Sequence, residues 1–187
     1  SNGWSSTAIG AVGITGGVCY QAPTYTVFGS GTGLSGTSDQ YQFVNTSING
    51  NYTVIARVAS AQNTATGTKA GIVITESSAT GSRRVSLCVV PSSGKIEFQS
   101  RKTTGGRVSV KTTATGAAPK WLKITRNGST FTAYYSNNGT SWTNYSSASV
   151  TMATTALAGL VVTSGSNSLL HTASFDNVSV VPGVVAR

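Results

Sequence analysis

The amino-acid sequence predicts an all-β fold, a β-sandwich of two antiparallel sheets, and three observations carry this prediction. Thr, Ser, Val, Tyr and Gly are abundant in the 187 residues, and such a composition suits pleated strands joined by small turns. Apolar and polar residues alternate over short runs, as they do when one face of a strand is buried. Pairs that contain Gly separate the runs. All-β sandwiches often reach this length without dividing, so we expect one domain over residues 1–187.

The segment 121–143, WLKITRNGSTFTAYYSNNGTSWT, shows this pattern most clearly. Its three alternating runs are broken by Asn127-Gly128 and by Asn138-Gly139. Asn and Gly accept the positive φ that tight hairpin turns require. We therefore expect a β-meander here.

Alternation also assigns the two faces of this meander. The face expected in the core carries Leu122, Ile124, Phe131, Ala133 and Tyr135. Trp121 and Tyr134 then lie on the opposite face, where an aromatic ring offers a flat apolar plate to the C–H face of a sugar. Packing beneath a loop is the alternative for each ring.

Turn signals divide the rest of the chain into further strands. We expect strands at 17–29, 40–47, 51–60, 68–76, 84–91, 95–102, 106–113, 120–126, 130–136, 141–152, 157–163 and 169–181. Gly-containing pairs separate consecutive strands from the second to the seventh, at 49–50, 66–67, 80–81, 93–94 and 105–106. Strands at this spacing form a jelly roll or an immunoglobulin-like sandwich, and the length of the chain favours the jelly roll.

The charged residues are few and mainly basic. Thirteen Lys and Arg oppose four acids, which gives a net charge of +9, and ten of the basic residues lie between Arg83 and Arg126 with one acid, Glu97. We expect a basic field over the strands that carry them. Protection of edge strands and attraction of an acidic polymer are both open interpretations.

Nucleic acid and membrane are not expected partners. The sequence has no recognition helix and no motif in which aromatic and basic residues interleave. No apolar run approaches the roughly 18 residues that a bilayer requires.

The two cysteines, Cys19 and Cys88, match no metal-binding spacing. Cys88 lies in the apolar run 85–90, which is typical of a buried strand, where a free Cys behaves as a small apolar side chain. A disulfide between the two cysteines and a pair of buried thiols both remain open.

Residues suited to catalysis are scarce. Glycoside hydrolysis needs two carboxylates that flank the scissile bond, and the chain has only Asp39, Glu76, Glu97 and Asp176. None of these forms a pattern of alternate acids along one strand. The one histidine, His171, has the same parity as Phe175, so we expect it to face the core. The sequence therefore favours a protein that is not an enzyme.

From about residue 9 to residue 181 the chain resembles the bacterial modules of the domain of unknown function 1349 type. These are secreted modules of the concanavalin A-like lectin/glucanase superfamily, often attached to glycoside hydrolases or to other extracellular enzymes. The matching pieces are residues 9–13, 28–31, 38–44, 54–58, 69–74, 98–101, 121–126, 131–136, 159–164 and 173–178. Two pieces depart from the pattern. An Asp of the Ser-x-Asp-Gly-x-x-Trp turn is Asn138 here, and an Arg that would precede Glu76 is Thr75.

The resemblance implies a concanavalin A-like jelly roll that acts as a non-catalytic carbohydrate-binding module of a secreted or cell-surface bacterial protein. The partners it implies are a polysaccharide, acidic in one interpretation, and a parent enzyme or surface protein in the same chain. Many such modules hold a structural calcium ion, for which Asp39 and Asp176 are the expected ligands. Capping of turns by these two residues is the alternative.

The expected ligand-binding residues are two aromatic plates, Trp121 and Tyr134, and two donors, Arg101 and Lys69. Two other functions remain open. The first is a structural or adhesion spacer without a glycan site. The second is a polysaccharide lyase or hydrolase that acts on an acidic glycan through Arg101, Tyr134 and His171.

Overall fold

A computed structural model describes residues 3–183, which contain strands and turns but no helix, and thus no helix that could cross a membrane. The fifteen strands are β1 (Ser5–Ile9), β2 (Gly17–Gln21), β3 (Thr24–Gly31), β4 (Gly33–Ser35), β5 (Ser38–Asn49), β6 (Tyr52–Ala61), β7 (Lys69–Thr75), β8 (Arg84–Val90), β9 (Lys95–Arg101), β10 (Ser109–Thr115), β11 (Lys120–Asn127), β12 (Thr130–Ser136), β13 (Thr143–Ser149), β14 (Thr155–Thr163) and β15 (Ser166–Pro182).

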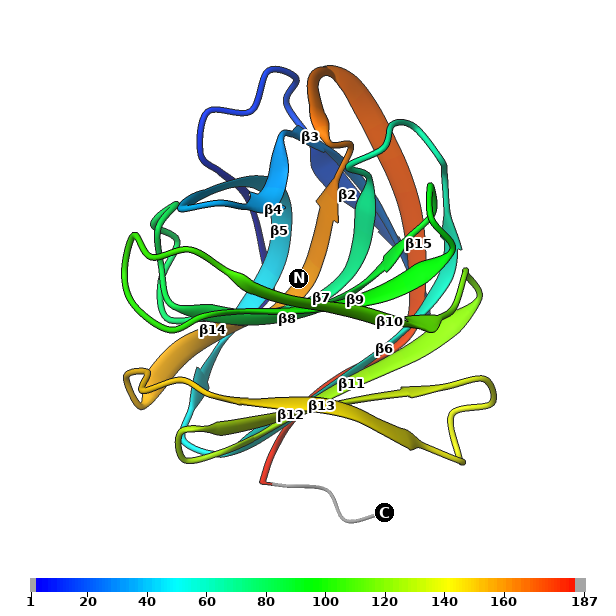
Figure 1. The fold of residues 1–187 in the computed structure, drawn as a ribbon. Helices are drawn as coiled ribbons and strands as arrows, with labels where there is room; N and C mark the ends of the chain where they lie inside the picture. The colour runs from blue at the N-terminus through cyan, green and yellow to red at the C-terminus, as the bar shows by residue number, and fades with distance from the viewer. Residues whose placement is uncertain (1–2, 184–187) are drawn as a thin grey trace.

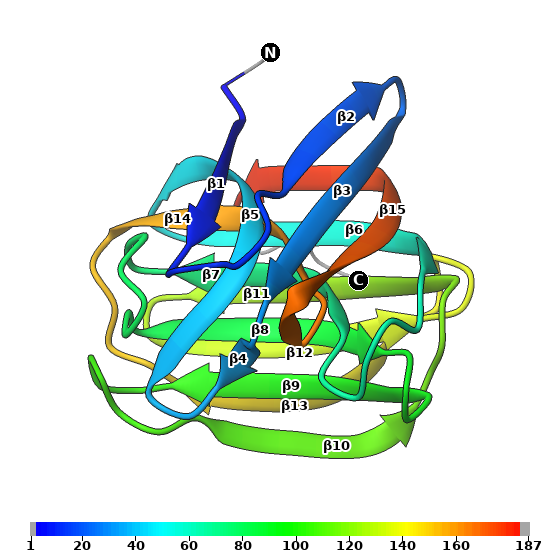
Figure 2. The same cartoon turned by 90° about the horizontal axis from the view of Figure 1, so that it is seen from above.

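The strands form two antiparallel sheets in two layers (Figure 1). One sheet has the order β1-β5-β14-β7-β8-β9-β10, with β4 paired to β5, and the other has the order β13-β12-β11-β6-β15-β3-β2. Strands β1 and β2 lie at one end of the molecule and β10 at the other (Figure 2), and β13 lies below β10 (Figure 1). The predicted two-sheet jelly-roll sandwich is confirmed. The sandwich therefore has two open ends, one between the edge strands β1 and β2 and one between β10 and β13.

The expected meander forms as β11, β12 and β13. Trp121 pairs with Ser136 and Lys123 with Tyr134 across β11 and β12. Gly128 and Gly139 take positive φ values of 60° and 75° in the two turns, which is the conformation that the Asn-Gly pairs predict.

Three expectations about the strands were wrong, all near the N-terminus. Residues 17–29 form a hairpin of β2 and β3 instead of one strand, because Pro23 in the turn has no amide hydrogen with which to continue a ladder. Strands β1 and β4 were not predicted. Both are short, and they owe their strand conformation to pairing with β5, which local alternation does not reveal.

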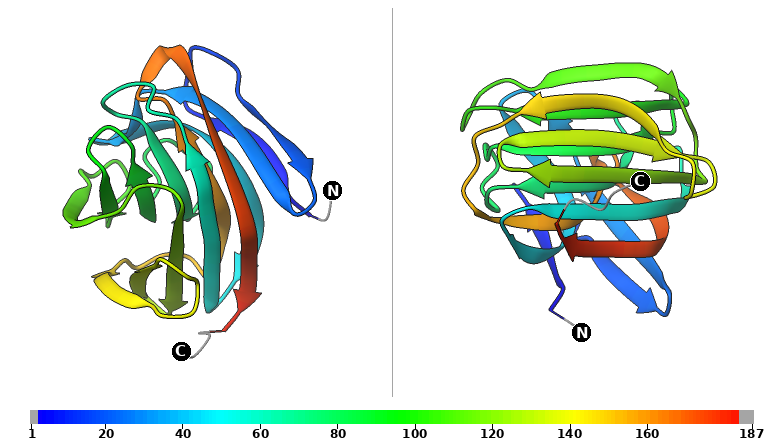
Figure 3. Two further views of the ribbon diagram at one scale, coloured as in Figure 1. Left: turned by 90° about the vertical axis from the view of Figure 1, so that its right-hand side faces the viewer. Right: turned by 90° about the horizontal axis from the view of Figure 1, so that it is seen from below.

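The main core lies between the inner faces of the two sheets. It includes Leu122, Ile124, Phe131 and Ala133, each with no exposed surface, and Tyr135 packs at its margin. The predicted core face of the meander is therefore confirmed. Figure 3 shows how the curved layers enclose this core, with the yellow and green strands at one end and the blue strands at the other.

A second apolar cluster lies on the outer face of the eight-stranded sheet. Its members are Ile9, Leu34, Tyr41, Phe43, Val73, Cys88 and Val161. Strand β4 lies over this face (Figures 1 and 2) and contributes Leu34, which is completely buried. Much of this outer face is therefore covered by the protein itself.

The two cysteines are not bridged. Cys88 is buried in the second cluster and Cys19 is exposed on β2, in the other sheet. Burial raises the pKa of Cys88 to about 12, so it remains a neutral thiol. The expectation of a buried apolar Cys88 is confirmed. Both alternatives for the pair are wrong, because the two cysteines are not bridged and Cys19 is exposed.

His171 on β15 faces inwards, as its parity with Phe175 predicts, and has no exposed surface. Its Nδ1 lies 3.2 Å from the hydroxyl oxygen of Thr64, and its Nε2 has no hydrogen-bond partner among residues 3–183. Burial lowers the pKa of His171 to about 4. The imidazole is therefore neutral at pH 7.

We expect acid to destabilise the fold through this histidine. The folded-state pKa of about 4 lies below the value near 6.5 of an unfolded chain, so the unfolded state binds the additional proton between these two pH values. Stability that is present above pH 6.5 is lost as the pH falls towards 4, by about 2 kcal/mol between pH 7 and pH 5. Urea unfolding of the native protein and of His171→Asn across this range should show that the substitution removes this loss. Parallel pH curves for the two proteins would contradict the assignment.

Candidate functional site

The residues that the sequence predicts as ligand-binding do not form one site. Trp121 and Tyr134 lie on the outer face of the seven-stranded sheet, on β11 and β12. Lys69 and Arg101 lie on the outer face of the eight-stranded sheet, on β7 and β9. The sheets pack through their inner faces, so the two pairs point in opposite directions.

The aromatic side chains on the seven-stranded sheet are engaged in local contacts. A Cβ placed on Gly139 would lie 2.8 Å from the indole ring of Trp121, so this ring packs directly on the glycine backbone. The ammonium of Lys123 lies 4.6 Å from the ring centroid of Tyr134 and 4.3 Å from that of Trp142. Each of these two rings therefore presents a face to Lys123, and all three aromatic side chains are partly buried.

On the eight-stranded sheet, Arg101 is part of a buried ionic network. The carboxylate of Asp39 accepts hydrogen bonds at 2.7 and 3.0 Å from Arg84, and at 2.6 and 2.8 Å from Arg101. Arg101 also donates to backbone carbonyls at Gly36, Thr80, Ser82 and Gly106. Neither guanidinium has any exposed surface. Arg101 is therefore a bridge between loops, and its expected role as a donor to a ligand does not fit this position.

The network continues along the same face towards Lys69. Arg84 donates to Gln99 at 3.0 Å, and Gln99 donates to Glu97 at 2.6 Å. The ammonium of Lys69 lies 3.5 Å from the Glu97 carboxylate, and both side chains are nearly nine-tenths buried. Asp39, Arg101 and Lys69 are thus brought onto one face. Asp39 and Arg101 pair with each other, and Lys69 pairs with Glu97.

The two aspartates do not fit the calcium site that the resemblance implies. Asp39 and Asp176 belong to opposite sheets. Asp39 is enclosed by two guanidinium groups, and Asp176 pairs with Arg57 at 2.7 Å. A cation placed beside either carboxylate would face arginine charges. Among residues 3–183 no three His, Cys, Asp or Glu side chains gather at one point.

A hollow lies at the open end between β1 and β2. We call it the aromatic groove. It has a volume of about 560 Å³ and is lined by Trp4, Ser5, Ser6, Val18, Tyr20, Tyr25 and Val44. Small-molecule sites typically have volumes of roughly 300–1,000 Å³.

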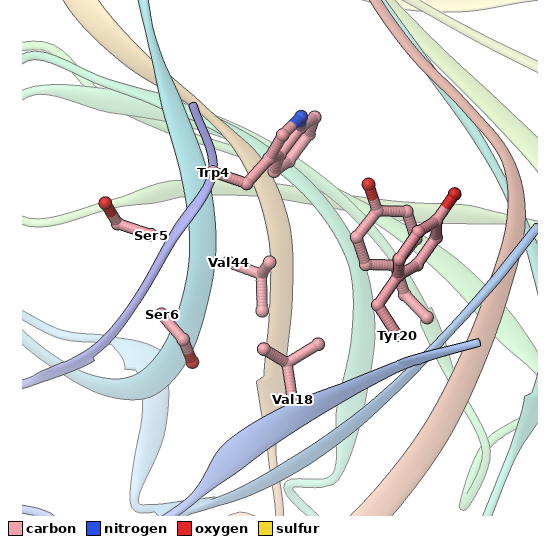
Figure 4. Close-up of a pocket in the computed structure, with 7 residues that line it drawn as sticks. Trp4, Ser5, Ser6, Val18, Tyr20 and Val44 are labelled. Carbon is pink, nitrogen blue, oxygen red and sulfur yellow. The ribbon is translucent and has the colours of Figure 1, made fainter. Parts of the chain in front are cut away.

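Both sheets contribute to the aromatic groove. Ser6 on β1 pairs with Val44 on β5, and Tyr20 on β2 pairs with Tyr25 on β3. Because side chains alternate along a strand, Val18 and Tyr20 face the groove and Cys19 points away from it. In Figure 4, Trp4 lies above Val44 and Val18, and Tyr20 lies to the right of both valines.

The three aromatic rings form a contiguous surface. The ring centroid of Tyr25 lies 5.7 Å from that of Trp4 and 4.4 Å from that of Tyr20. Tyr20 has 57% of its surface exposed, whereas Trp4 and Tyr25 are half-buried. Burial, and to a lesser degree Tyr20, raises the pKa of Tyr25, so its hydroxyl remains a hydrogen-bond donor.

The groove contains hydroxyl groups but no charged side chain. The hydroxyl of Ser6 accepts a hydrogen bond of 2.8 Å from Gln42, which leaves its own hydrogen available. Apolar rings flanked by hydroxyl donors are suited to a neutral ligand that has apolar faces and polar edges.

Local sequence patterns did not reveal this site. One strand was predicted over residues 17–29 and none at β1, so nothing placed Trp4 beside Tyr20 and Tyr25. The available signal was Pro23, which lies between the two tyrosines and predicts a turn that brings them together.

Comparisons with known proteins establish the fold class. No family model matches the chain, and no curated protein matches it in sequence. A functionally unknown protein from Saccharomyces cerevisiae has a similar structure, with a TM-score of 0.78 at 12% identity over 98% of both chains.

Two bacterial structures are also similar. The carbohydrate-binding module CBM66 from Bacillus subtilis matches with a TM-score of 0.58 at 16% identity, over 95% of this chain and 94% of the module. The GH43 protein BlXynB from Bacillus licheniformis matches with a TM-score of 0.58 at 18% identity, over 82% of this chain but 32% of that protein. At these identities the likeness shows the fold alone, a two-sheet jelly-roll sandwich.

We predict that Asp39→Asn severely destabilises the protein. The substitution leaves Arg84 and Arg101 buried without a counter-charge, and breaking such a pair typically costs about 3–5 kcal/mol. Asp176→Asn is the matched control, because the side chains of Arg57 and Asp176 are 33% and 21% exposed, and such a pair contributes at most about 1 kcal/mol. Urea unfolding of both variants measures the difference. Equal losses in the two variants would show that the Asp39 network is not a stability determinant.

Proposed function

We propose that this chain is a non-catalytic carbohydrate-binding module that holds a neutral polysaccharide in the aromatic groove. The observation that carries the proposal is the contiguous surface of Trp4, Tyr25 and Tyr20 in a hollow of about 560 Å³ without charged lining residues. A pyranose ring has an apolar C–H face that packs on an aromatic ring, while its hydroxyls reach donors at the rim.

The ion pairs of the chain support a role without catalysis. Each of the four acidic residues is paired with a basic side chain: Asp39 with Arg84 and Arg101, Glu76 with Arg83, Glu97 with Lys69, and Asp176 with Arg57. His171 is buried and has no access to a substrate. A glycosidase needs two carboxylates placed on either side of one bond, and paired acids on two opposite sheets do not offer them.

The structural likenesses support the wider setting of the proposal. One similar structure is that of a carbohydrate-binding module, and the likeness to BlXynB covers about a third of that longer chain. We extend the proposal to a module of the domain of unknown function 1349 type, carried by a secreted or surface bacterial protein beside an enzyme in the same polypeptide. The rival is a spacer domain that binds no glycan.

Removal of Tyr20 should weaken glycan binding strongly. Burial of an aromatic side chain contributes about 1.5–3 kcal/mol, so we expect Tyr20→Ala to lower the affinity for a bound neutral polysaccharide about tenfold or more. Isothermal titration against a soluble β-glucan, a xylan and a mannan measures this loss. Tyr20 is more than half exposed, so its removal should leave the melting temperature nearly unchanged.

Tyr134→Ala is the matched control for this experiment. It removes the same type of side chain from the outer face of the seven-stranded sheet, where the sequence predicts a ligand contact. We expect this substitution to leave the affinity for the glycan unchanged. Loss of binding in Tyr134→Ala and not in Tyr20→Ala would move the site to that face. If the native protein binds none of the three neutral glycans, the result would favour a spacer domain without a glycan site.

A further inference from the structure

The open end opposite the aromatic groove carries a second hollow. We call it the basic groove. It has a volume of about 170 Å³ between β9, β10 and β13 and is lined by Phe98, Ser100, Lys102, Ser109, Val110, Lys111, Ser146, Ser147 and Ala148. This volume is the share of about six water molecules, so the groove fits one sugar unit or its charged substituent.

Two lysines and four serines give this groove its chemistry. Lys111 bridges the open end, because its ammonium donates to the carbonyl oxygen of Tyr145 at 2.7 Å and lies 4.9 Å from the Tyr145 ring centroid. An ammonium has three donors, so Lys111 keeps two for a ligand. Lys102 is exposed and has no partner within residues 3–183.

The position of these lysines matters because most of the basic residues are already engaged. Of the ten between Arg83 and Arg126, seven have partners inside the protein: Arg83, Arg84, Arg101, Lys111, Lys120, Lys123 and Arg126. Carboxylates pair with Arg83, Arg84 and Arg101, whereas Lys111, Lys120 and Arg126 donate to neutral oxygens and keep their charge. Within the described part of the chain, Lys95, Lys102 and Arg107 have no side-chain partner, and Lys102 and Arg107 lie in the loop between β9 and β10 that leads into the basic groove.

No acidic side chain neutralises the lysines of the basic groove. None of the residues that line the basic groove is acidic, and all four acidic residues of the chain are paired elsewhere. An anion that enters the groove would meet two ammonium groups and several hydroxyls. It would not have to displace a protein carboxylate.

We propose that the basic groove binds the anionic group of an acidic polysaccharide, a uronate carboxylate or a sulfate ester. The ammonium groups of Lys102 and Lys111 would pair with the anion, and the serine hydroxyls would contact the sugar hydroxyls. Nucleic acid fits less well, because base stacking needs exposed aromatic rings and the one ring here, Phe98, is 4% exposed. This inference goes beyond the proposed neutral-glycan site and does not depend on it.

The test compares two charge reversals on the same strand region. Lys102→Glu places a carboxylate in the groove. Lys95→Glu makes the same change of net charge about 20 Å away along the strand. The probes are polygalacturonate and dextran sulfate, with unmodified dextran as the neutral reference. A third variant, Ser109→Asp, introduces a negative charge in the groove without removing a lysine.

We expect Lys102→Glu and Ser109→Asp to weaken binding of an acidic polymer about tenfold, which is about 1.4 kcal/mol, because each places a carboxylate beside the bound anion. Lys95→Glu should change the affinity less than about twofold. Binding should also weaken between about 0.1 M and about 1 M salt, which shortens the Debye length from about 10 Å to about 3 Å. All three positions are on the surface, so unchanged melting temperatures would confirm folding.

Several results would overturn the proposal. Equal losses in Lys102→Glu and Lys95→Glu would mean that net charge alone attracts the polymer. If the native protein binds no acidic polymer, the role of the lysines is limited to protection of the edge strands. A single-stranded oligonucleotide that binds more tightly and displaces polygalacturonate would identify nucleic acid as the partner. Tyr20→Ala should still bind the acidic polymer. Failure of the proposal for one groove can therefore be distinguished from failure of the proposal for the other.

Discussion

The buried ion pairs of Asp39 with Arg84 and Arg101 constrain more of this structure than any other polar contact. They join the start of β5 to β8 and β9, and Arg101 extends the connection to carbonyls in three loops. Because a buried charge without a partner is very unfavourable, these segments must pack together for the chain to fold. Strand β4 is thereby held over the outer face of the eight-stranded sheet, where Leu34 completes the second apolar cluster.

This constraint decides where a ligand can approach. The outer face of the eight-stranded sheet is covered by the protein's own chain, and the aromatic rings on the other outer face are packed on Gly139 and Lys123. At each of the two open ends, side chains from both layers line a hollow. One end presents aromatic rings and hydroxyls, and the other presents ammonium groups and hydroxyls. The same sandwich thus offers different chemistry at each end.

Some features were predictable because they depend on local sequence. Asn-Gly turns and two-residue alternation located β11 and β12 and assigned Leu122 and Phe131 to the core. Other features depend on pairing between distant segments. Nothing near Arg101 indicates that its charge is neutralised by Asp39, 62 positions away, and nothing near Trp4 indicates that Tyr25 lies against it. For this reason the sequence could not show that Asp39 and Arg101, expected as a calcium ligand and a donor to a ligand, bind each other.

The sequence by itself determined the class of fold, the meander, the inward orientation of His171 and the buried nature of Cys88. Periodicity and turn chemistry act over a few residues, so a single sequence contains this information. Only the tertiary structure decided which charged side chains form ion pairs, which aromatic rings are accessible to a ligand and where the hollows lie. These properties depend on contacts between strands that are distant in the sequence. The role of an ammonium group or an indole ring is therefore decided by its neighbours in space.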